Sequence, residues 1–439
     1  MNDSELIHRY FYAWAVFLPI TSFLLLPSVQ GTTIAYVFSL ASVAVVLFGS
    51  VFRDTRYIGN LLVFLAFYVP LYLAGQLGLL YHPTIDLTGI NLVDPDSLKL
   101  FFRSSSFTQS LYLFSGVLTF LYAKRFYRES WDRYLFIGAL VICFYGLYEV
   151  TYFQVFHSNG DFVSNRMFGK HTGSWFQTTQ IGSLTIERLK SLTGEPSMAA
   201  FTLLPYWIYA IHKGRTKTHW LLFVALLLTT STTAYVGIAI YGGCRLLFYR
   251  LSDKFNAAIP FAAMVAGLVL YKPIVTYFTL FVWDKFFTKN ISGMERQSSF
   301  DFHMRFFEHL PIANKLFGIG FGVIRSTDMF STLLVNVGIV GIVVMTLFFV
   351  VPIVKLERSY ENTGIKIMLI VLYVTMMMAV SEFAYLPTWL FLGITYNKLH
   401  EQKRKKSEVR THVRKTDLHQ RAVFDAGRDG RSALRDRTG

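Results

Sequence analysis

Charged residues are scarce in this sequence. They make up 16% of its 439 residues, whereas a soluble globular protein carries about 25%. Hydrophobic residues make up 53% and the mean hydropathy is +0.41, so we exclude a soluble globular protein and predict a membrane protein. Cysteine is rare as well: Cys143 and Cys244 both lie inside apolar runs, which excludes a disulfide framework and a cysteine metal site. No signal-peptide cleavage site follows the first apolar run, and we expect that run to stay in the protein.

Long apolar runs are abundant, and a helix needs about 20 such residues to cross the hydrocarbon core of a bilayer. Two runs are too long for one crossing. A polar break divides each of them, at 229–233 and at Ser381-Glu382, so each is predicted to be a hairpin of short helices. The sequence therefore predicts an all-α polytopic membrane protein with about twelve transmembrane helices. The runs are 10–29, 32–52, 58–80, 107–123, 134–156, 197–212, 219–249, 258–283, 329–354 and 364–397.

The net charge of +15 first indicates an anionic partner such as nucleic acid. Most of the positive charge, however, lies in short clusters between apolar runs, as expected for cytoplasmic loops of a membrane protein, so no nucleic acid is predicted. Both termini are then cytoplasmic, and 1–400 forms the membrane domain. Residues 401–439 hold twelve Lys and Arg against six Asp and Glu and lack apolar periodicity, which predicts a disordered tail. The segments facing outward are 81–106, 157–196 and 284–328.

The outward segment 157–196 ends in polar residues directly before an apolar run. Pro196 and the preceding Glu195 are typical of a helix start, so helix capping is one interpretation of Glu195. Capping leaves Arg188 and Lys190 unexplained, because cations on the outer face run against the positive-inside bias.

The outward segment 284–328 contains a second polar pattern. If 300–310 is helical, Asp301, Arg305 and His309 fall on one face. This predicts an amphipathic helix on the outer leaflet, and an interfacial helix without chemistry explains the pattern equally well. The glycines at 318, 320 and 322 lack the βαβ unit of a dinucleotide site. They favour a close approach of the backbone to a ligand or a neighbouring helix.

Four acidic residues are weaker candidates. Asp94-Pro95-Asp96 resembles the metal-binding acid pair of some glycosyltransferases, but this pattern is more typical of a turn. Glu149 and Glu382 lie near the outer ends of predicted helices, where snorkelling or helix bridging is the commoner role. No zinc, dinucleotide or ATP-binding pattern occurs, so neither a metal nor a cofactor is predicted.

Two motifs in the outward loops carry a resemblance to a known family. Arg188, Ser191, Glu195 and Pro196 are spaced as R-x-x-S-x-x-x-E-P. Arg305 is followed by the glycine-rich run 316–322 (LFGIGFG) and by a Gly-Ile-Val-Gly sequence at 338–341. Together they resemble the bacterial polysaccharide polymerase and ligase superfamily, which holds the Wzy-type O-antigen and exopolysaccharide polymerases and the O-antigen ligases.

The resemblance covers about residues 185–350, and the polar break at 229–233 is similar to the family's T-x-S hairpin. Ligases usually carry a His-Asn pair where this chain has Thr327-Asp328-Met329, which favours a polymerase. The arginine-x(10)-glycine spacing of some polymerases is absent after Arg188 and after Arg305, so this chain departs from the family there.

The resemblance implies a GT-C-like bundle in the bacterial inner membrane. It implies transfer of an oligosaccharide from a polyprenyl diphosphate carrier to a second lipid-linked unit at the periplasmic face, beside a chain-length regulator and a flippase. Arg188 and Arg305 are then candidate ligands of the leaving diphosphate, because planar charged groups hold it without a metal. Glu195 is the first candidate for the general base. The candidate substrate-binding residues are Lys190, Ser191, His303, Asp328, Gly320 and Gly322.

Three alternatives remain open from the sequence. The first is an O-antigen ligase. The second is a glycosyltransferase that uses a polyprenyl-monophosphate sugar and a metal held by Asp94 and Asp96. The third is a lipid-linked sugar flippase, which predicts cavity-facing charges in both halves of the bundle.

Overall fold

The computed structural model describes residues 3–249 and 291–409, apart from positions 28, 30, 49–54, 83–84, 97, 169–170, 173–174 and 182. The predicted crossing at 258–283 and the tail beyond 409 lie outside the described residues. Most of the described residues are helical, as predicted. The helices are α1 (Asp3–Phe17), α2 (Ile34–Phe48), α3 (Thr55–Tyr81), α4 (Ser104–Phe126), α5 (Asp132–Phe156), α6 (Pro196–His212), α7 (Thr216–Leu228), α8 (Thr232–Phe248), α12 (Ile291–His309), α13 (Ile312–Phe317), α14 (Met329–Lys355), α15 (Tyr360–Ala379) and a last helix over 386–409.

Four of the described helices are long and apolar enough to cross a membrane: Arg56–Tyr81, Glu129–Phe156, Met329–Lys355 and Tyr360–Ala379. This supports an all-α membrane protein, but it is fewer than the twelve crossings that the apolar runs predict. The difference arises because several of those runs form helices of fewer than 18 residues, such as α1 with 15.

Both predicted helix breaks are present. Thr229, Thr230 and Ser231 separate α7 from α8, and residues 380–385 separate α15 from the last helix. At the first break Ser231 takes the N-cap position of α8 and accepts a hydrogen bond from the backbone N–H of Thr233, which is a favoured way to start a helix.

Two features differ from the sequence prediction. The outward segment 157–196 contains two antiparallel hairpins, β1 (Met167–Phe168) with β2 (His171–Thr172) and β3 (Thr178–Ile181) with β4 (Leu184–Glu187). In addition, the predicted disorder from residue 401 is wrong for 401–409, because the last helix runs to 409. Gln402 fixes this extension by accepting from the N–H of Glu357 and donating to the carbonyl of Lys355.

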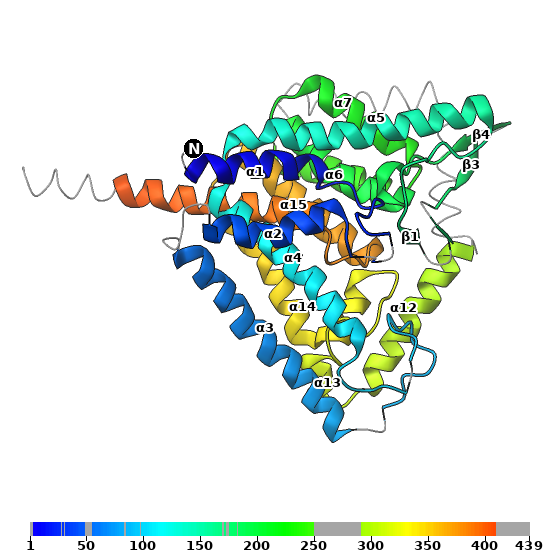
Figure 1. The fold of residues 1–439 in the computed structure, drawn as a ribbon, viewed down its shortest axis with the longest axis vertical. Helices are drawn as coiled ribbons and strands as arrows, with labels where there is room; N and C mark the ends of the chain where they lie inside the picture. The colour runs from blue at the N-terminus through cyan, green and yellow to red at the C-terminus, as the bar shows by residue number, and fades with distance from the viewer. Residues whose placement is uncertain are drawn as a thin grey trace, which may run out of the picture.

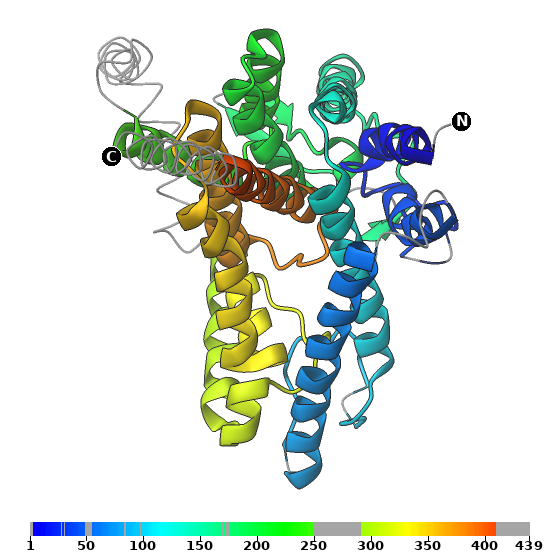
Figure 2. The same ribbon diagram turned by 90° about the vertical axis from the view of Figure 1, so that its left-hand side faces the viewer.

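The helices form a bundle with a diverging pair of arms (Figure 1). The bundle contains α1, α2, α5, α6, α7 and α15, and α6 lies at its centre, where every residue from 198 to 210 is buried. Figure 2 shows the arms, one made of α3 with α4 and the other of α12 with α14.

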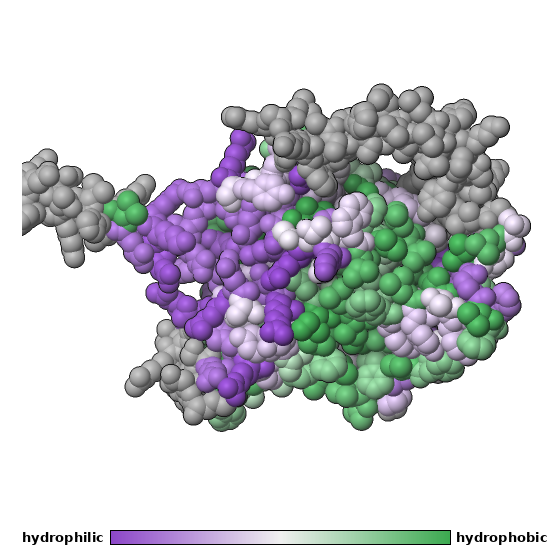
Figure 3. Space-filling view, turned by 90° about the horizontal axis from the view of Figure 1, so that it is seen from above, coloured by the Kyte–Doolittle hydropathy of each residue, from purple (hydrophilic) through white to green (hydrophobic). Residues whose placement is uncertain are grey.

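The surface has a hydrophobic region next to a strongly hydrophilic end (Figure 3). The hydrophilic end holds the start of α1 and the last helix, and we call it the basic end. The β-hairpins lie at the opposite end of the bundle, which we call the outer end (Figure 1).

Candidate functional site

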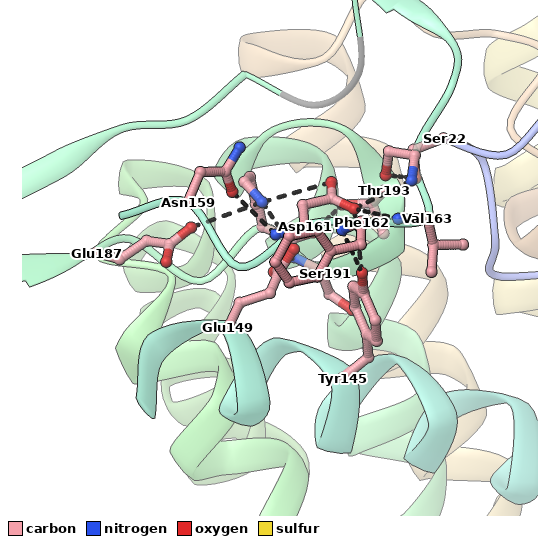
Figure 4. A network of polar contacts seen from close by, with 12 residues as sticks. Ser22, Tyr145, Glu149, Asn159, Asp161, Phe162, Val163, Glu187, Ser191 and Thr193 are labelled. Carbon is pink, nitrogen blue, oxygen red and sulfur yellow. Dashed lines mark hydrogen bonds and ion pairs between the residues drawn. The ribbon is translucent and has the colours of Figure 1, made fainter. Parts of the chain in front are cut away.

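Lys190, a predicted substrate-binding residue, is surrounded by three buried carboxylates, those of Glu149, Asp161 and Glu187, which are labelled in Figure 4. Its Nζ atom is 2.7 Å from Oε1 of Glu149, 3.5 Å from Oδ2 of Asp161 and 3.5 Å from Oε1 of Glu187. The Lys190 side chain has no exposed surface. This cation at the outer end is therefore compensated within the protein, and direct contact with a substrate requires the network to open.

The same network fixes the outward segment to α5. Ser191, another predicted site residue, donates its backbone N–H to Oε2 of Glu149 and its hydroxyl to the carbonyl of Ile142. Oδ1 of Asp161 accepts from the hydroxyl of Tyr145 and from the N–H of Ser164. Glu149 thus bridges α5 to the residues before α6, in agreement with the helix-bridging role predicted for it.

Glu187 makes the fewest side-chain hydrogen bonds of the charged residues in the network. Both of its carboxylate oxygens are buried, and neither has a hydrogen-bond partner among the described residues, although Oε1 is within ion-pair distance of Lys190. Burial raises the pKa of Glu187, and the charge of Lys190 opposes this shift. One lysine with three carboxylates leaves the network with excess negative charge if all are ionised, so the network favours a proton on one of the carboxylates.

Arg188 connects β4 to the break between α7 and α8. Its Nε atom donates to Oγ1 of Thr230 at 2.9 Å, and Nη2 donates to the carbonyl of the same residue at 3.3 Å. Nη1 donates to the side-chain carbonyl of Gln177. A cation at the last carbonyls of a helix satisfies them and interacts favourably with the helix dipole. In this structure Arg188 therefore positions two outer segments, and its predicted role in binding diphosphate stays a prediction.

Glu195 takes the N-cap position of α6, but its side chain makes no capping hydrogen bond. Its Oε1 atom accepts from the hydroxyl of Ser197 at 2.9 Å. The residue is partly exposed at the outer end. The Glu195 carboxylate thus lies close to the start of α6 but does not accept a capping hydrogen bond from the helix backbone. It therefore keeps acceptor capacity for a proton, which the predicted role as a general base needs.

The second outward segment forms α12, so the helix expected over 300–310 is confirmed. Arg305 is exposed, and its Nε atom donates to the carbonyl of Asp301 one turn earlier. Figure 1 shows the C-terminal half of α12 well away from β3 and β4. The structure therefore does not bring Arg305 next to Arg188.

His303 and Asp328 come together through two serines. Nδ1 of His303 donates to the carbonyl of Ser299, whose hydroxyl lies 3.3 Å from that of Ser326. Ser326 in turn donates to Oδ2 of Asp328 at 3.2 Å. Burial lowers the pKa of His303, which favours the neutral imidazole. Asp328 is also the N-cap of α14, where it accepts from the N–H of Ser331.

The glycine-rich run packs against an opened turn of α14. Gly338 interrupts that helix with φ of 67°, and a Cβ there would lie 2.3 Å from the carbonyl oxygen of Leu316. The N–H groups of Ile319 and Gly320 donate to backbone carbonyls of α14 that the interruption frees. Of the two predicted interpretations, the close approach to a neighbouring helix is the one seen. Gly322 is also tightly packed, since a Cβ would meet the side chain of Gln109 at 2.4 Å.

This packing fixes the position of Arg325, just beyond the run. Oδ1 of Asn336 in α14 accepts from the N–H groups of Val323 and Ile324, and Nδ2 donates to the carbonyl of Ile324. The N–H of Arg325 then donates to the carbonyl of Asn91. The backbone around Arg325 is thus tied to two other segments, while its side chain remains 51% exposed.

Arg325 meets Glu382, the acidic residue in the break before the last helix. Its Nη2 atom lies 2.9 Å from Oε2 of Glu382. The neighbouring residues hold this break in place: the hydroxyl of Tyr36 donates to the carbonyl of Ala384, and the indole N–H of Trp389 donates to that of Phe383.

A second arginine, Arg166, approaches Glu382 from the outward segment before β1. Its Nη1 atom donates to the carbonyl of Thr21 at 3.1 Å. Arg166, Glu382, Tyr36 and Tyr385 line one small cavity of about 10 Å³, which has room for about one water molecule. We call Arg166, Arg325, Glu382, Tyr385 and Glu195 the Glu382 cluster.

Tyr385 is influenced electrostatically by three other members of the Glu382 cluster. Burial raises the pKa of Tyr385; the charges of Glu382 and Glu195 act in the same direction, and Arg166 opposes them. The hydroxyl of Tyr385 contacts that of Thr202 on α6. Arg325 pairs with Glu382, and Arg166 lines the same small cavity as Glu382, so two guanidinium groups lie near this carboxylate.

Arg166 and Arg325 are the site residues that sequence reasoning missed. Neither belongs to a recognisable motif. The available signal was the one that drew attention to Arg188, namely a cation in a segment predicted to face outward. The acid pair at 94 and 96 forms a turn, in which Asp94 accepts from the hydroxyl of Ser104. Within the described ranges, no group of three His, Cys, Asp or Glu side chains is arranged to hold a metal ion.

Comparison with known proteins adds no assignment: no protein-family model matches this chain, and no curated protein is significantly similar to it.

Proposed function

We propose that this protein is a glycosyltransferase that polymerises lipid-linked oligosaccharide units at the periplasmic face of the bacterial inner membrane, using a polyprenyl diphosphate donor and no metal. The observation that carries this proposal is the Glu382 cluster, in which Arg325 pairs with Glu382 and Arg166 lines the same small cavity as Glu382. The motif resemblance around Arg188 and Arg305 supports the same reaction class.

The chemistry follows from the charges of the cluster. In the reaction, the bond between the anomeric carbon of the donor and the diphosphate oxygen breaks, and a bond forms from that carbon to an acceptor hydroxyl oxygen. The leaving diphosphate gains negative charge in the transition state, which two permanently charged, planar guanidinium groups stabilise. The acceptor proton passes to a carboxylate, for which Glu382 and Glu195 are the candidates. Holding two large lipid-linked substrates together supplies much of the remaining rate enhancement.

In the absence of substrate, Arg325 and Glu382 neutralise each other in an ion pair. The cavity beside it is too small for a diphosphate, so binding requires a rearrangement. We propose that an incoming diphosphate takes the Arg325 guanidinium from Glu382, which frees that carboxylate to accept a proton. The Lys190 network and Arg188 act as positioning groups, because they fix the outward segment that carries Arg166.

The membrane topology belongs to the same proposal. The shorter helices α1, α2, α6 and α7 lie in the bundle with the long α5 and α15, and α8 packs against α6 and α15. We propose that these helices and the last helix enter the bilayer too. With both termini cytoplasmic, the basic end faces the cytoplasm and the Glu382 cluster faces the periplasm.

The test is gel analysis of surface polysaccharide from a strain that lacks the gene and carries it, or a variant, on a plasmid. Loss of polymer with one repeat unit capped on the acceptor supports a polymerase. Absence of any transfer of finished polymer to the surface instead supports an O-antigen ligase. Normal chain length with both Arg325→Ala and Glu382→Ala variants contradicts the assignment of the cluster.

A further inference from the structure

A buried histidine lies where α12 packs against the start of α14. His303 is 1% exposed. Its Nδ1 atom donates to the carbonyl of Ser299, one turn earlier in α12, at 2.6 Å. Its Nε2 atom is buried and has no hydrogen-bond partner among the described residues. The ring is therefore neutral in this contact, with its single proton on Nδ1.

This contact does not accommodate a protonated ring. A second proton would lie on Nε2, because an imidazolium donates from both nitrogens. In the part of the chain that the structure describes, Nε2 meets no acceptor, and an enclosed charge without a partner is costly. Burial accordingly lowers the pKa of His303 below its ordinary value of 6.5, and the Ser299 carbonyl and the charge of Asp328 oppose this shift only in part.

Asp328 is the charged group that acts on His303, but its carboxylate is already engaged. Oδ1 accepts from the N–H of Ser331, and Oδ2 accepts from the hydroxyls of Ser326 and Ser331. The other ionisable side chains near the contact, on α12 beyond 296, in the segment 85–93 and in the loop 318–328, are all exposed. They are Asp301, Arg305, Glu308, His309, Asp86 and Arg325.

Hydrogen bonds connect this contact to the backbone at Arg325. The hydroxyl of Ser299 lies 3.3 Å from that of Ser326, the residue after Arg325. The same hydroxyl accepts from Nδ2 of Asn91 at 3.3 Å, and the carbonyl of Asn91 accepts from the N–H of Arg325 at 2.9 Å. Ser299 is thus tied to the Arg325 loop along two paths, and separation of α12 from this loop breaks both.

We propose that the contact of α12 with the loop 323–328 is an acid-sensitive switch, closed while His303 is neutral and opened by acidity on the outward side. In the open state the ring is exposed and binds a proton near its ordinary pKa of 6.5. Below this pH the open state binds the proton more readily than the closed state, so acid shifts the equilibrium towards opening. Above this pH neither state is protonated, and the contact stays closed. The switch concerns the packing of α12 and does not depend on the proposed function.

The test is hydrogen–deuterium exchange, read by mass spectrometry, of the full chain purified in detergent. Exchange is compared at about pH 7.5 and about pH 5.5, on either side of the ordinary histidine pKa, after correction for the intrinsic exchange rates. We expect the protection of 299–309 and of 323–328 to fall at the lower pH by up to about tenfold, the limit for one proton bound one pH unit below the open-state pKa. Equal protection at both pH values overturns the proposal.

His303→Gln removes the proton site but keeps a donor for the Ser299 carbonyl, so this variant should show equal protection at both pH values. His309→Gln is the matched control. His309 also donates Nδ1 to the carbonyl four residues earlier, that of Arg305, at 2.7 Å, but it is exposed. The control should keep the acid response of the wild type. A full acid response in His303→Gln overturns the role of this histidine.

Two further measurements do not depend on the folding of the His303 variant. The midpoint of the wild-type response should lie between pH 6.5 and about 5; a midpoint near 4, where carboxylates titrate, overturns the proposal. Ser299→Ala removes the hydroxyl that connects α12 to Ser326 and Asn91 and keeps the carbonyl bonded to His303. It should leave the acid response of 299–309 in place and weaken that of 323–328. An unchanged response in 323–328 overturns the connection to the Arg325 loop.

Discussion

Arg325 and Glu382 are 57 residues apart in the chain, yet Nη2 of Arg325 lies 2.9 Å from Oε2 of Glu382. The pair joins the loop after the glycine-rich run to the break before the last helix. Half of the Arg325 side chain is exposed, and partly exposed pairs stabilise a fold by about 1 kcal/mol or less. The pair therefore contributes little to the stability of the fold, and its location at the outer end points instead to a role in function.

Arg325→Ala and Glu382→Ala should each abolish or strongly shorten the polymer while the protein remains in the membrane at normal levels. Arg325→Lys should restore little, because an ammonium group cannot replace the planar fork that holds a diphosphate. Polysaccharide gels and quantitative immunoblots of membranes check both parts. Lys99→Gln, at an exposed position in another outward segment, is the control and should leave chain length unchanged.

Arg188→Ala and Arg305→Ala should both abolish polymer, but for distinguishable reasons. Arg188 holds the break between α7 and α8, so its loss should also lower the melting temperature of the purified protein. Arg305 is exposed, and we expect its loss to leave that temperature unchanged. Normal polymer from the Arg305→Ala variant would show that this residue does not belong to the site. Normal polymer from both variants would mean that the motif resemblance no longer supports the proposed function.

Lys190→Met should destabilise the protein more than any substitution at the surface. It leaves three buried carboxylates without their cation, which typically costs about 3–5 kcal/mol. Combining it with Glu149→Gln should recover part of this loss, because the carboxylate nearest to Nζ, at 2.7 Å, is then neutral. Thermal unfolding of the single and double variants measures the coupling, and strictly additive losses contradict the network.

Glu187→Gln should stabilise the protein at neutral pH. The pKa of Glu187 is raised in the folded state, so its favourable contribution is complete below the ordinary value of 4.5 and is lost as the pH rises through the folded value. A neutral glutamine avoids this loss. We expect a gain of roughly 2–4 °C in melting temperature near neutral pH that disappears at acidic pH. A gain of the same size at every pH would contradict a role for ionisation.

Gly338→Ala should distort the backbone of α14 and displace the loop that carries Arg325. The residue has φ of 67°, and a Cβ would lie 2.3 Å from the carbonyl oxygen of Leu316, so the opened turn of α14 must shift. Because this turn fixes the loop before Arg325, polymer should be lost together with stability. Gly59→Ala is the matched control, since a Cβ there meets nothing within 4 Å.

Local patterns predicted the helices and their breaks well. Thr229, Thr230 and Ser231 end α7 because their side chains compete for backbone hydrogen bonds. Asp328 caps the start of α14 through its side chain, and Pro196 favours the first turn of α6 because its φ is fixed and it lacks an N–H. Such signals need only a few neighbouring residues. The short hairpins around β3 and β4 escaped prediction because their segments lack a long alternating pattern.

The site was less predictable because its partners are distant in the chain. Lys190 was a candidate for substrate binding as an outward cation, but Glu149, which neutralises it, lies 41 residues earlier. Glu382 was noted as costly inside a helix, while nothing local indicated that Arg166 and Arg325 would approach it. Only the packing of four segments decides which outward cations meet a carboxylate.

Because α3 is long, the thickness of the bilayer affects its tilt and thereby the position of the loop that carries Arg325. Its 27 residues span about 40 Å at about 1.5 Å each, which exceeds a hydrocarbon core of about 30 Å and requires a tilt of roughly 40° if the whole helix is to stay inside. Only 6% of this span is buried in the protein, so most of α3 can face lipid, and bilayer thickness acts on its tilt together with helix packing. Gly75 of α3 packs on the backbone of Phe317 and Gly318, and a thinner membrane would therefore press on the loop that presents Arg325.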